Sequence, residues 1–258
     1  MVPMMRMMDS FGVSDIGRRR KLNEDSFFVD DELGLYIVAD GMGGHNAGEV
    51  ASSLAVEVVS NFIRRSREEE EITWPYGIDP QISLNGNRLR TAVMLANKRV
   101  WKEADNREEY TGMGSTLVAA LAASEEVLLC NAGDSRAYRL RDGKLQQVTT
   151  DDSWVQAALS EGVLQPQEIQ HHYMKNIITK AIGARENIDV GILEHKLQPQ
   201  DLYLLCSDGL HGMVNDGEIE RIIVSAQGEL EKAVRELIQA ANEGGGKDNI
   251  SAVLFRHR

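Results

Sequence analysis

The chain has 258 residues, of which 42% are apolar, and its formal net charge is −12. This length suits one large domain or two small ones with a sizeable core, and the negative charge argues against binding to nucleic acid or to an anionic membrane. No apolar run approaches the roughly eighteen residues that a membrane-spanning helix needs, and the two cysteines, Cys130 and Cys206, lack the spacing of a zinc or redox site. We expect a soluble, cytoplasmic monomer with both cysteines buried and reduced, and a disordered or artefactual N-terminus over residues 1–8.

The first part of the chain predicts three strands and then a helix. The strands are "FGVSDIG" (11–17), "DSFFVD" (25–30) and "GLYIVAD" (34–40), and we expect them to be antiparallel neighbours. Apolar residues then recur at helical spacing over Ala47–Arg64, directly after Asn46, which is a suitable N-cap.

A long inserted connection is predicted over residues 66–86, where a charge run is mixed with turn formers and aromatics. Its aromatic segment, Trp74 to Tyr76, either packs on the helices or forms an exposed contact for a partner. Packing is favoured because aromatic residues in long loops usually anchor them. A second amphipathic helix is predicted over Asn87–Asp105.

The second half of the chain predicts strands in blocks and helices in pairs. Three apolar strands lead to a tight hairpin at Asp142-Gly143, and a mixed segment over 151–183 contains two short helices. Strands at 188–197 and 202–209, helices at about 216–226 and 229–243, and a strand from Asn249 follow. This order differs from the strict alternation of a parallel sheet and indicates layered sheets with helical hairpins outside, in a single domain over 1–258.

Four apolar strands have an aspartate at one end, namely Asp40, Asp134, Asp208 and Asp248. Each one alone is explained by the capping that aspartate commonly provides at strand ends. Together they suggest more, because strand ends can meet at one edge and gathered carboxylates repel each other unless a cation lies among them. Oxygen ligands without cysteine or histidine suit Mg²⁺ or Mn²⁺, and the glycines of "DGMGGH" would let the backbone approach such an ion.

Arg20 precedes the acid pair Glu24-Asp25 by four residues. One interpretation is an exposed, charged turn between two strands. The other places a guanidinium beside a metal centre as a bidentate clamp for phosphate oxygens, which its planar fork suits better than a lysine.

Seven segments, in order along nearly the whole chain, carry a family resemblance. They are "DIGRRRKLNED" (15–25), "VADGMGGHNAGEVAS" (38–52), "GMGSTLVAA" (112–120), "NAGDSRAY" (131–138), "NIITKAIG" (176–183), "LLCSDGL" (204–210) and "GGKDNISAVL" (245–254). With them the chain resembles the metal-dependent protein phosphatases of the protein phosphatase 2C family, in their bacterial serine/threonine form.

The resemblance implies an α+β fold, a four-layer α/β/β/α sandwich with two central antiparallel sheets flanked by antiparallel helix pairs. It also implies two Mn²⁺ or Mg²⁺ ions bridged by a water, and in bacterial members often a third ion. By this resemblance the metal ligands are Asp40, the carbonyl of Gly41, Asp208 and Asp248, with Asp134 and Asp208 for the third ion. Glu24 and Asp25 match acids that hold metal-bound and bridging water, and Arg20 matches the phosphate-binding arginine.

The chain departs from the family pattern in three places. Met42 stands where animal members carry a proton-donating histidine; His45 close by is either a surface histidine or the general acid. Asp152 replaces a histidine common in bacterial relatives, and "QHHYMKN" replaces their His-Pro, which affects the flap near the site. Ser207 beside Asp208 is interpreted as a strand-end hydroxyl and not as a nucleophile, because no base is evidently paired with it.

The leading functional hypothesis is a phosphatase that removes phosphate from serine and threonine in proteins, opposing a bacterial serine/threonine kinase. The main alternative is a catalytically silent regulator that binds a phosphoprotein or a kinase; it is disfavoured because the acids and Arg20 are all retained. A purely structural metal module leaves Arg20 and Glu24 unexplained, and a phosphatase of anti-sigma-factor antagonists is a minor alternative because no sensor domain is fused to the chain.

Overall fold

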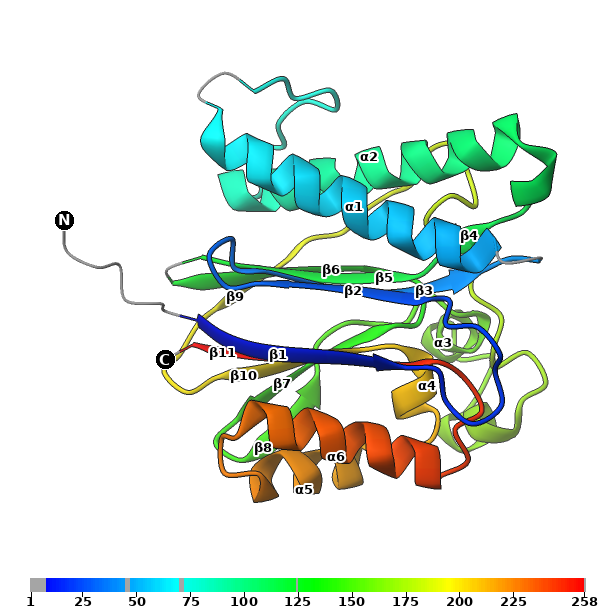
Figure 1. The fold of residues 1–258 in the computed structure, drawn as a ribbon, viewed down its shortest axis with the longest axis vertical. Helices are drawn as coiled ribbons and strands as arrows, with labels where there is room; N and C mark the ends of the chain where they lie inside the picture. The colour runs from blue at the N-terminus through cyan, green and yellow to red at the C-terminus, as the bar shows by residue number, and fades with distance from the viewer. Residues whose placement is uncertain (1–7, 45–46, 70–71, 124, 258) are drawn as a thin grey trace.

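The structure is a computed structural model that describes residues 8–44, 47–69, 72–123 and 125–257. Two antiparallel β-sheets lie face to face, and a pair of helices covers the outer face of each sheet (Figure 1). The predicted α/β/β/α sandwich of the α+β class is confirmed.

The lower sheet in Figure 1 has the strand order β1-β11-β10-β7-β8. Its strands are β1 (Met8–Asp15), β7 (Arg136–Arg141), β8 (Lys144–Gln147), β10 (Leu202–Cys206) and β11 (Ile250–His257). The upper sheet has the order β2-β3-β5-β6-β9, with β4 paired to β3. Its strands are β2 (Asp25–Asp30), β3 (Leu35–Met42), β4 (Gly114–Ser115), β5 (Leu117–Ala122), β6 (Glu126–Ala132) and β9 (Leu193–Lys196). The predicted hairpin at Asp142-Gly143 joins β7 to β8, with Arg141 opposite Lys144.

The first strand does not adjoin the second, contrary to the prediction. β1 pairs with β11, from Met8 opposite His257 to Asp15 opposite Ile250, whereas β2 and β3 do pair. Pairing between the two ends of a chain leaves no local signal in the sequence. Met8 is buried within β1, so the disordered N-terminus predicted over 1–8 is wrong at that residue. The remainder of that segment lies outside the described residues.

The upper helices, α1 (Ala47–Glu68) and α2 (Leu84–Asn106), extend beyond their predicted ends. α1 continues through its charged last turns, where Arg65 pairs with Glu69, and α2 begins at the N-cap Ser83. The connection predicted over 66–86 therefore shortens to 69–83. Its aromatic residues pack as predicted: the Trp74 ring meets Phe62 edge-on at 6.5 Å, and the Tyr76 hydroxyl donates to the Met94 carbonyl. The predicted N-cap Asn46 lies outside the described residues.

The lower helix pair is α5 (Asp216–Ser225) and α6 (Leu230–Glu243), within a residue of prediction at most ends. The short helix α4 (Asp208–His211) and a 3₁₀ turn at Glu108–Tyr110 were not predicted. The segment 151–183 contains α3 (Trp154–Ser160) and a 3₁₀ turn (Pro166–His171), as expected, whereas β9 is shorter than the strand predicted at 188–197. Among the described residues, no helix is both long and apolar enough to cross a bilayer.

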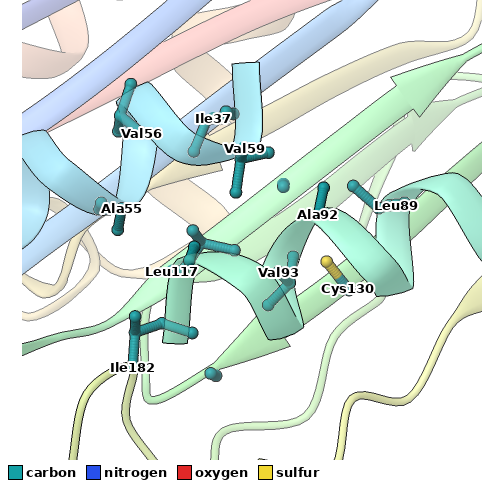
Figure 2. Close-up of a cluster of buried hydrophobic side chains, with 14 of the residues drawn as sticks. Ile37, Ala55, Val56, Val59, Leu89, Ala92, Val93, Leu117, Cys130 and Ile182 are labelled. Carbon is teal, nitrogen blue, oxygen red and sulfur yellow. The ribbon is translucent and has the colours of Figure 1, made fainter. Parts of the chain in front are cut away.

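Three apolar layers hold the sandwich together. Between the upper sheet and its helices, α1 residues such as Val59 and α2 residues such as Val93 pack on Ile37 and Leu117 (Figure 2). Between the sheets, the rings of Tyr36 and Tyr203 stack on Phe255, with centroids 4.0 and 5.2 Å away. A third cluster lies between the lower sheet and α4–α6. Both cysteines are buried and free, as predicted; Cys130 lies in the first cluster and Cys206 in the third.

Candidate metal centre

The predicted acids come from both sheets and meet at one end of the sandwich, at the right of Figure 1 near the end of β3 and α4. From the upper sheet come Asp25, the first residue of β2, and Asp40, its cross-strand partner in β3. From the lower sheet come Asp208, which directly follows β10 as the first residue of α4, and Asp248, just before β11. Asp40 does not end its strand as predicted, because Gly41 and Met42 pair with β4.

The carboxylates in this group raise each other's pKa. Burial, followed by the charges of neighbouring acids, raises the pKa of Asp40 well above its usual range. These neighbours are, in decreasing order of effect, Asp25, Asp208, Asp248 and Asp134. Burial first, and then the charges of Asp134, Asp248 and Asp25, raises the pKa of Asp208 to about 7. Burial is also the main cause that raises the pKa of Asp25 to about 6.

Two oxygens in the group, Asp25 Oδ1 and Asp208 Oδ1, are buried without a hydrogen-bond partner. A buried carboxylate oxygen that accepts no bond is unfavourable, and a cation relieves both this and the repulsion between neighbours. Within the described residues, no three His, Cys, Asp or Glu side chains converge on one point by themselves. Mg²⁺ keeps several waters and needs only one or two carboxylates, so these residues fit a hydrated divalent ion.

Arg20 reaches into the acids from the loop before β2. Its Nη2 lies 2.7 Å from Asp248 Oδ2 and its Nη1 lies 3.5 Å from Glu24 Oε2. The hydrogen bond to Asp248 is the main cause that raises the pKa of Arg20. The arginine side chain is 46% exposed. The guanidinium is therefore bound to Asp248 on one side and accessible to solvent on the other. Arg20 is therefore not part of a free charged turn, and its role as a phosphate clamp stays a prediction.

The glycines after Asp40 let the start of α1 approach β3 closely. A Cβ on Gly41 would collide with the carbonyl of Gly48, and a Cβ on Gly48 would collide with Glu24 Oε1. The Gly41 amide also donates to the Glu24 carbonyl at 3.0 Å. The glycines therefore place the Glu24 carboxylate against the first turn of α1. That the Gly41 carbonyl binds an ion stays a prediction.

Asp134, predicted for a third ion, faces Asp208 across the edge of a cavity of about 920 Å³ between segment 153–176 and the α4–α5 region. Burial and then the charge of Asp151 raise the pKa of Asp134 to about 6. His211 Nε2 lies 3.0 Å from the Asp134 carbonyl oxygen. Burial lowers the pKa of His211 to about 4, so the ring is neutral near pH 7 and its Nε2–H donates this bond.

Ser207 and Asn249 are parts of the site that sequence reasoning missed. The Ser207 hydroxyl donates to Asp25 Oδ2 at 2.8 Å, so the interpretation that no base is paired with it was wrong. The serine is fully buried and also accepts from the Ser251 amide, so it orients Asp25 and is not placed to attack a substrate. The only sequence signal for both residues is a short polar side chain directly beside an acid of the site.

Asp152, where relatives commonly have histidine, ties the segment 153–183 to the turn that carries Asp134. Its amide donates to the Gly133 carbonyl at 2.8 Å, and its Oδ1 pairs with Lys180 Nζ at 3.0 Å. The predicted general acid His45 lies outside the described residues.

Comparisons with known proteins agree with this fold. The sequence profile of the family described as Protein phosphatase 2C matches residues 15–254. Serine/threonine phosphatase stp of Listeria welshimeri is 38% identical over 248 residues, which cover 93% of this chain and 92% of that protein. Protein phosphatase PhpP of Streptococcus pneumoniae is 33% identical over 94% of both chains.

Solved structures of serine/threonine phosphatases have a similar fold. The crystal structure of the Mycobacterium tuberculosis serine/threonine phosphatase PstP/Ppp superposes with a TM-score of 0.84 and 33% identity, over 97% of this chain and 99% of that one. The catalytic domain of PstP in complex with two manganese ions superposes with a TM-score of 0.81 and 34% identity, over 96% and 97% of the two chains. The chain belongs to the protein phosphatase 2C family.

Proposed function

We propose that this chain, as one phosphatase domain, hydrolyses phosphoserine and phosphothreonine in proteins with the help of Mn²⁺ or Mg²⁺. The observation that carries the proposal is the group of mutually repelling, partly unsatisfied carboxylates with one arginine set among them. Such a group suits cations on one side and a phosphate dianion on the other. Family membership and the relatives named as serine/threonine phosphatases support the same reaction.

Each side chain has a proposed role. Asp40, the Gly41 carbonyl, Asp208 and Asp248 would hold two ions, and Asp134 with Asp208 would hold a third. Divalent ions at such a site lower the pKa of a bound water and neutralise phosphoryl oxygens. The exposed edge of Arg20 binds phosphate oxygens and orients the phosphorus towards the acids.

Glu24 and Asp25 accept hydrogen bonds from the attacking water and align it with the phosphorus. Asp25 is fixed for this task by the hydroxyl of Ser207. His45 stays a prediction as the donor of a proton to the departing serine or threonine oxygen, because Met42 has no proton to give. A serine/threonine kinase that produces the phosphorylated substrate is the partner implied by this chemistry.

The test is the hydrolysis of p-nitrophenyl phosphate and of a phosphothreonine peptide, with and without Mn²⁺. Wild type is compared with Asp40→Asn and Asp208→Asn, and with Asp142→Asn as the matched control, since Asp142 is an exposed residue of the β7–β8 turn. We expect metal-dependent turnover that the first two substitutions abolish and the third leaves intact. A folded wild type without turnover in Mn²⁺ or, in a repeat of the assay, in Mg²⁺ would overturn the proposal and favour the silent binding protein.

A further inference from the structure

The buried amide of Asn249 joins the acid group to the loop that carries Arg20. This side chain is 3% exposed and directly follows Asp248. Its Nδ2 donates to the carbonyls of Ile16 at 3.0 Å and Leu22 at 2.9 Å, and its Oδ1 accepts from the Glu24 amide at 2.8 Å. One side chain therefore holds the backbone at both ends of the loop.

Asp248, the residue directly before Asn249, holds the guanidinium of Arg20. Arg20 Nη2 binds Asp248 Oδ2, and Asp248 Oδ1 accepts from the backbone N–H of Asn249 at 2.9 Å. The backbone of the loop and its functional side chain are thus fixed to two consecutive residues. Without the Asn249 side chain, Asp248 would still attract Arg20, but the loop would lose its hydrogen bonds at Ile16, Leu22 and the Glu24 amide. The bond from the Arg18 amide to the Gly246 carbonyl and the bond from the Gly41 amide to the Glu24 carbonyl would remain.

An asparagine is the residue type that this position requires. The contacts need two N–H donors and one acceptor on a short planar group. A primary amide supplies the donors through its NH₂ group and the acceptor through its carbonyl oxygen. Aspartate keeps the acceptor and loses the donors, and it adds a charge beside acids that already repel. Because the site is buried, water does not replace the lost bonds.

We propose that Asn249 is a positioning residue for phosphate binding, which fixes Arg20 and Glu24 against the acid group. This inference rests on the proposed function, since it concerns how the same site holds a phosphate. Displacement of a binding group by about 1 Å can reduce a rate roughly a hundredfold, so a loose loop has a measurable effect.

The chain contains a matched control in Asn97 of α2. This side chain is 1% exposed; its Nδ2 donates to the carbonyls of Arg185 and Glu186, both at 3.0 Å, and its Oδ1 accepts from the Gly183 amide at 2.9 Å. Asn97→Ala and Asn249→Ala therefore remove the same number and kind of hydrogen bonds. They differ in the loop that is released.

The first measurement is hydrogen–deuterium exchange of the whole chain in EDTA, which does not depend on activity. Asn249→Ala is expected to accelerate exchange of the amides in 17–24 at least about tenfold, while Asn97→Ala accelerates exchange around 183–186 and leaves 17–24 unchanged. Unchanged protection of 17–24 in Asn249→Ala would overturn the inference.

The second measurement is steady-state hydrolysis of p-nitrophenyl phosphate with inorganic phosphate as inhibitor, in saturating Mn²⁺. Asn249→Ala and Asn249→Asp are expected to raise KM and the inhibition constant of phosphate roughly tenfold, with a smaller change in kcat. Asn97→Ala should stay within about twofold of wild type. In an Arg20→Ala background, Asn249→Ala should add little, because both act through one group.

Additive effects of Arg20→Ala and Asn249→Ala on KM, or an equal rise of KM in Asn97→Ala, would show a merely structural asparagine and overturn the inference. If the wild type itself proves inactive, the proposed function fails separately. Inorganic phosphate binding by calorimetry then replaces KM: tenfold weaker binding in Asn249→Ala alone supports the positioning role, and equal binding overturns it.

Discussion

The two ends of strand β10 carry aspartates in opposite electrostatic situations. Asp201, just before the strand, is 1% exposed and accepts two hydrogen bonds from Arg141, at 2.6 and 2.5 Å, and one from the Gln198 amide at 2.8 Å. Asp208, just after it, leaves Oδ1 without a partner and lies among other acids, with its pKa raised to about 7. The first aspartate is satisfied by its own chain, and the second is not.

We interpret this difference as one between an acid that supports the fold and acids that, on the proposed function, serve a reaction. A carboxylate can be buried at the edge of the sandwich when it forms an ion pair with an arginine, as Asp201 does with Arg141. At the other end Arg20 pairs with Asp248 and Glu24, and neighbouring acids raise the pKa of Asp40 and Asp208. We propose that ligands from outside the chain neutralise this negative charge. The comparison yields four predictions, given in order of decreasing effect.

The largest effect is expected from removal of one charge at the reactive end. Asp40→Asn should lower kcat/KM in Mn²⁺ by at least about a hundredfold, because Asp40 interacts with the charges of Asp25, Asp208, Asp248 and Asp134 and is a proposed metal ligand. The metal-free protein should keep or gain stability, since a repulsion is removed. Hydrolysis of p-nitrophenyl phosphate and urea unfolding in EDTA measure the two quantities; retained activity would contradict the assignment.

Metal should stabilise the native chain through this end of the sandwich alone. Mn²⁺ at about a hundred times its dissociation constant should raise the free energy of unfolding by about 2.7 kcal/mol, and EDTA should reverse the change. Asp208→Asn should reduce this gain sharply, and Asp201→Asn should keep it. Thermal unfolding at several Mn²⁺ concentrations tests the prediction, which fails if both variants respond equally.

Loss of the hydrogen-bonded carboxylate at Asp201 should lower the free energy of unfolding and leave the rate of hydrolysis unchanged. Asp201→Asn leaves Arg141 without its carboxylate partner, although the bond from Arg141 to the Lys196 carbonyl remains. We expect a loss of about 2 kcal/mol in the free energy of unfolding, a moderate value because the arginine side chain is 23% exposed. Its kcat/KM in saturating Mn²⁺ at 20 °C or below should equal that of the wild type. A loss of activity without a loss of stability would refute this division between the two ends.

The smallest effect is a pH dependence of the metal-free protein. The pKa of Asp208 is raised to about 7 and that of Asp25 to about 6, both above the ordinary value near 3.9, so the folded chain binds these protons more tightly than the unfolded chain. Their contribution to stability is complete below about pH 4 and is lost as the pH rises to about 7.

In EDTA we therefore expect the free energy of unfolding that Asp208 contributes to fall by about 1 kcal/mol or more between pH 5 and pH 7.5. The wild type is compared with Asp208→Asn by urea unfolding at each pH, so that other titrating groups cancel. Saturating Mn²⁺ should abolish the difference, and a contribution that rises with pH would contradict the shifts.

The sequence predicts those parts of the molecule whose signals are local. The layers, the paired helices and the gathering of Asp40, Asp208 and Asp248 follow from periodicity, strand-end acids and family motifs. The roles of these acids as ligands stay predictions. The pairing of β1 with β11 and the bonds from Asn249 to Ile16 and Leu22 join residues more than two hundred positions apart, and no short-range pattern records them.

Local patterns also misplaced several boundaries. The end of α1 was predicted at Arg64 because charged residues indicate a loop, although a solvent-facing helical turn has the same composition. The contact of Ser207 with Asp25 was missed for a different reason, since a serine at a strand end is common and only its burial distinguishes it.

The inter-sheet core has a second role as a spacer. Asp40 belongs to the upper sheet, whereas Asp208 and Asp248 belong to the lower sheet, and the stacked rings of Tyr36 and Phe255 help to set the distance between the two sheets. A larger or smaller side chain in that layer changes the gap that an ion must bridge, even when it lies far from the acids. On the proposed function, the permitted volume of this core is therefore limited by the size of a hydrated cation as well as by the stability of the fold.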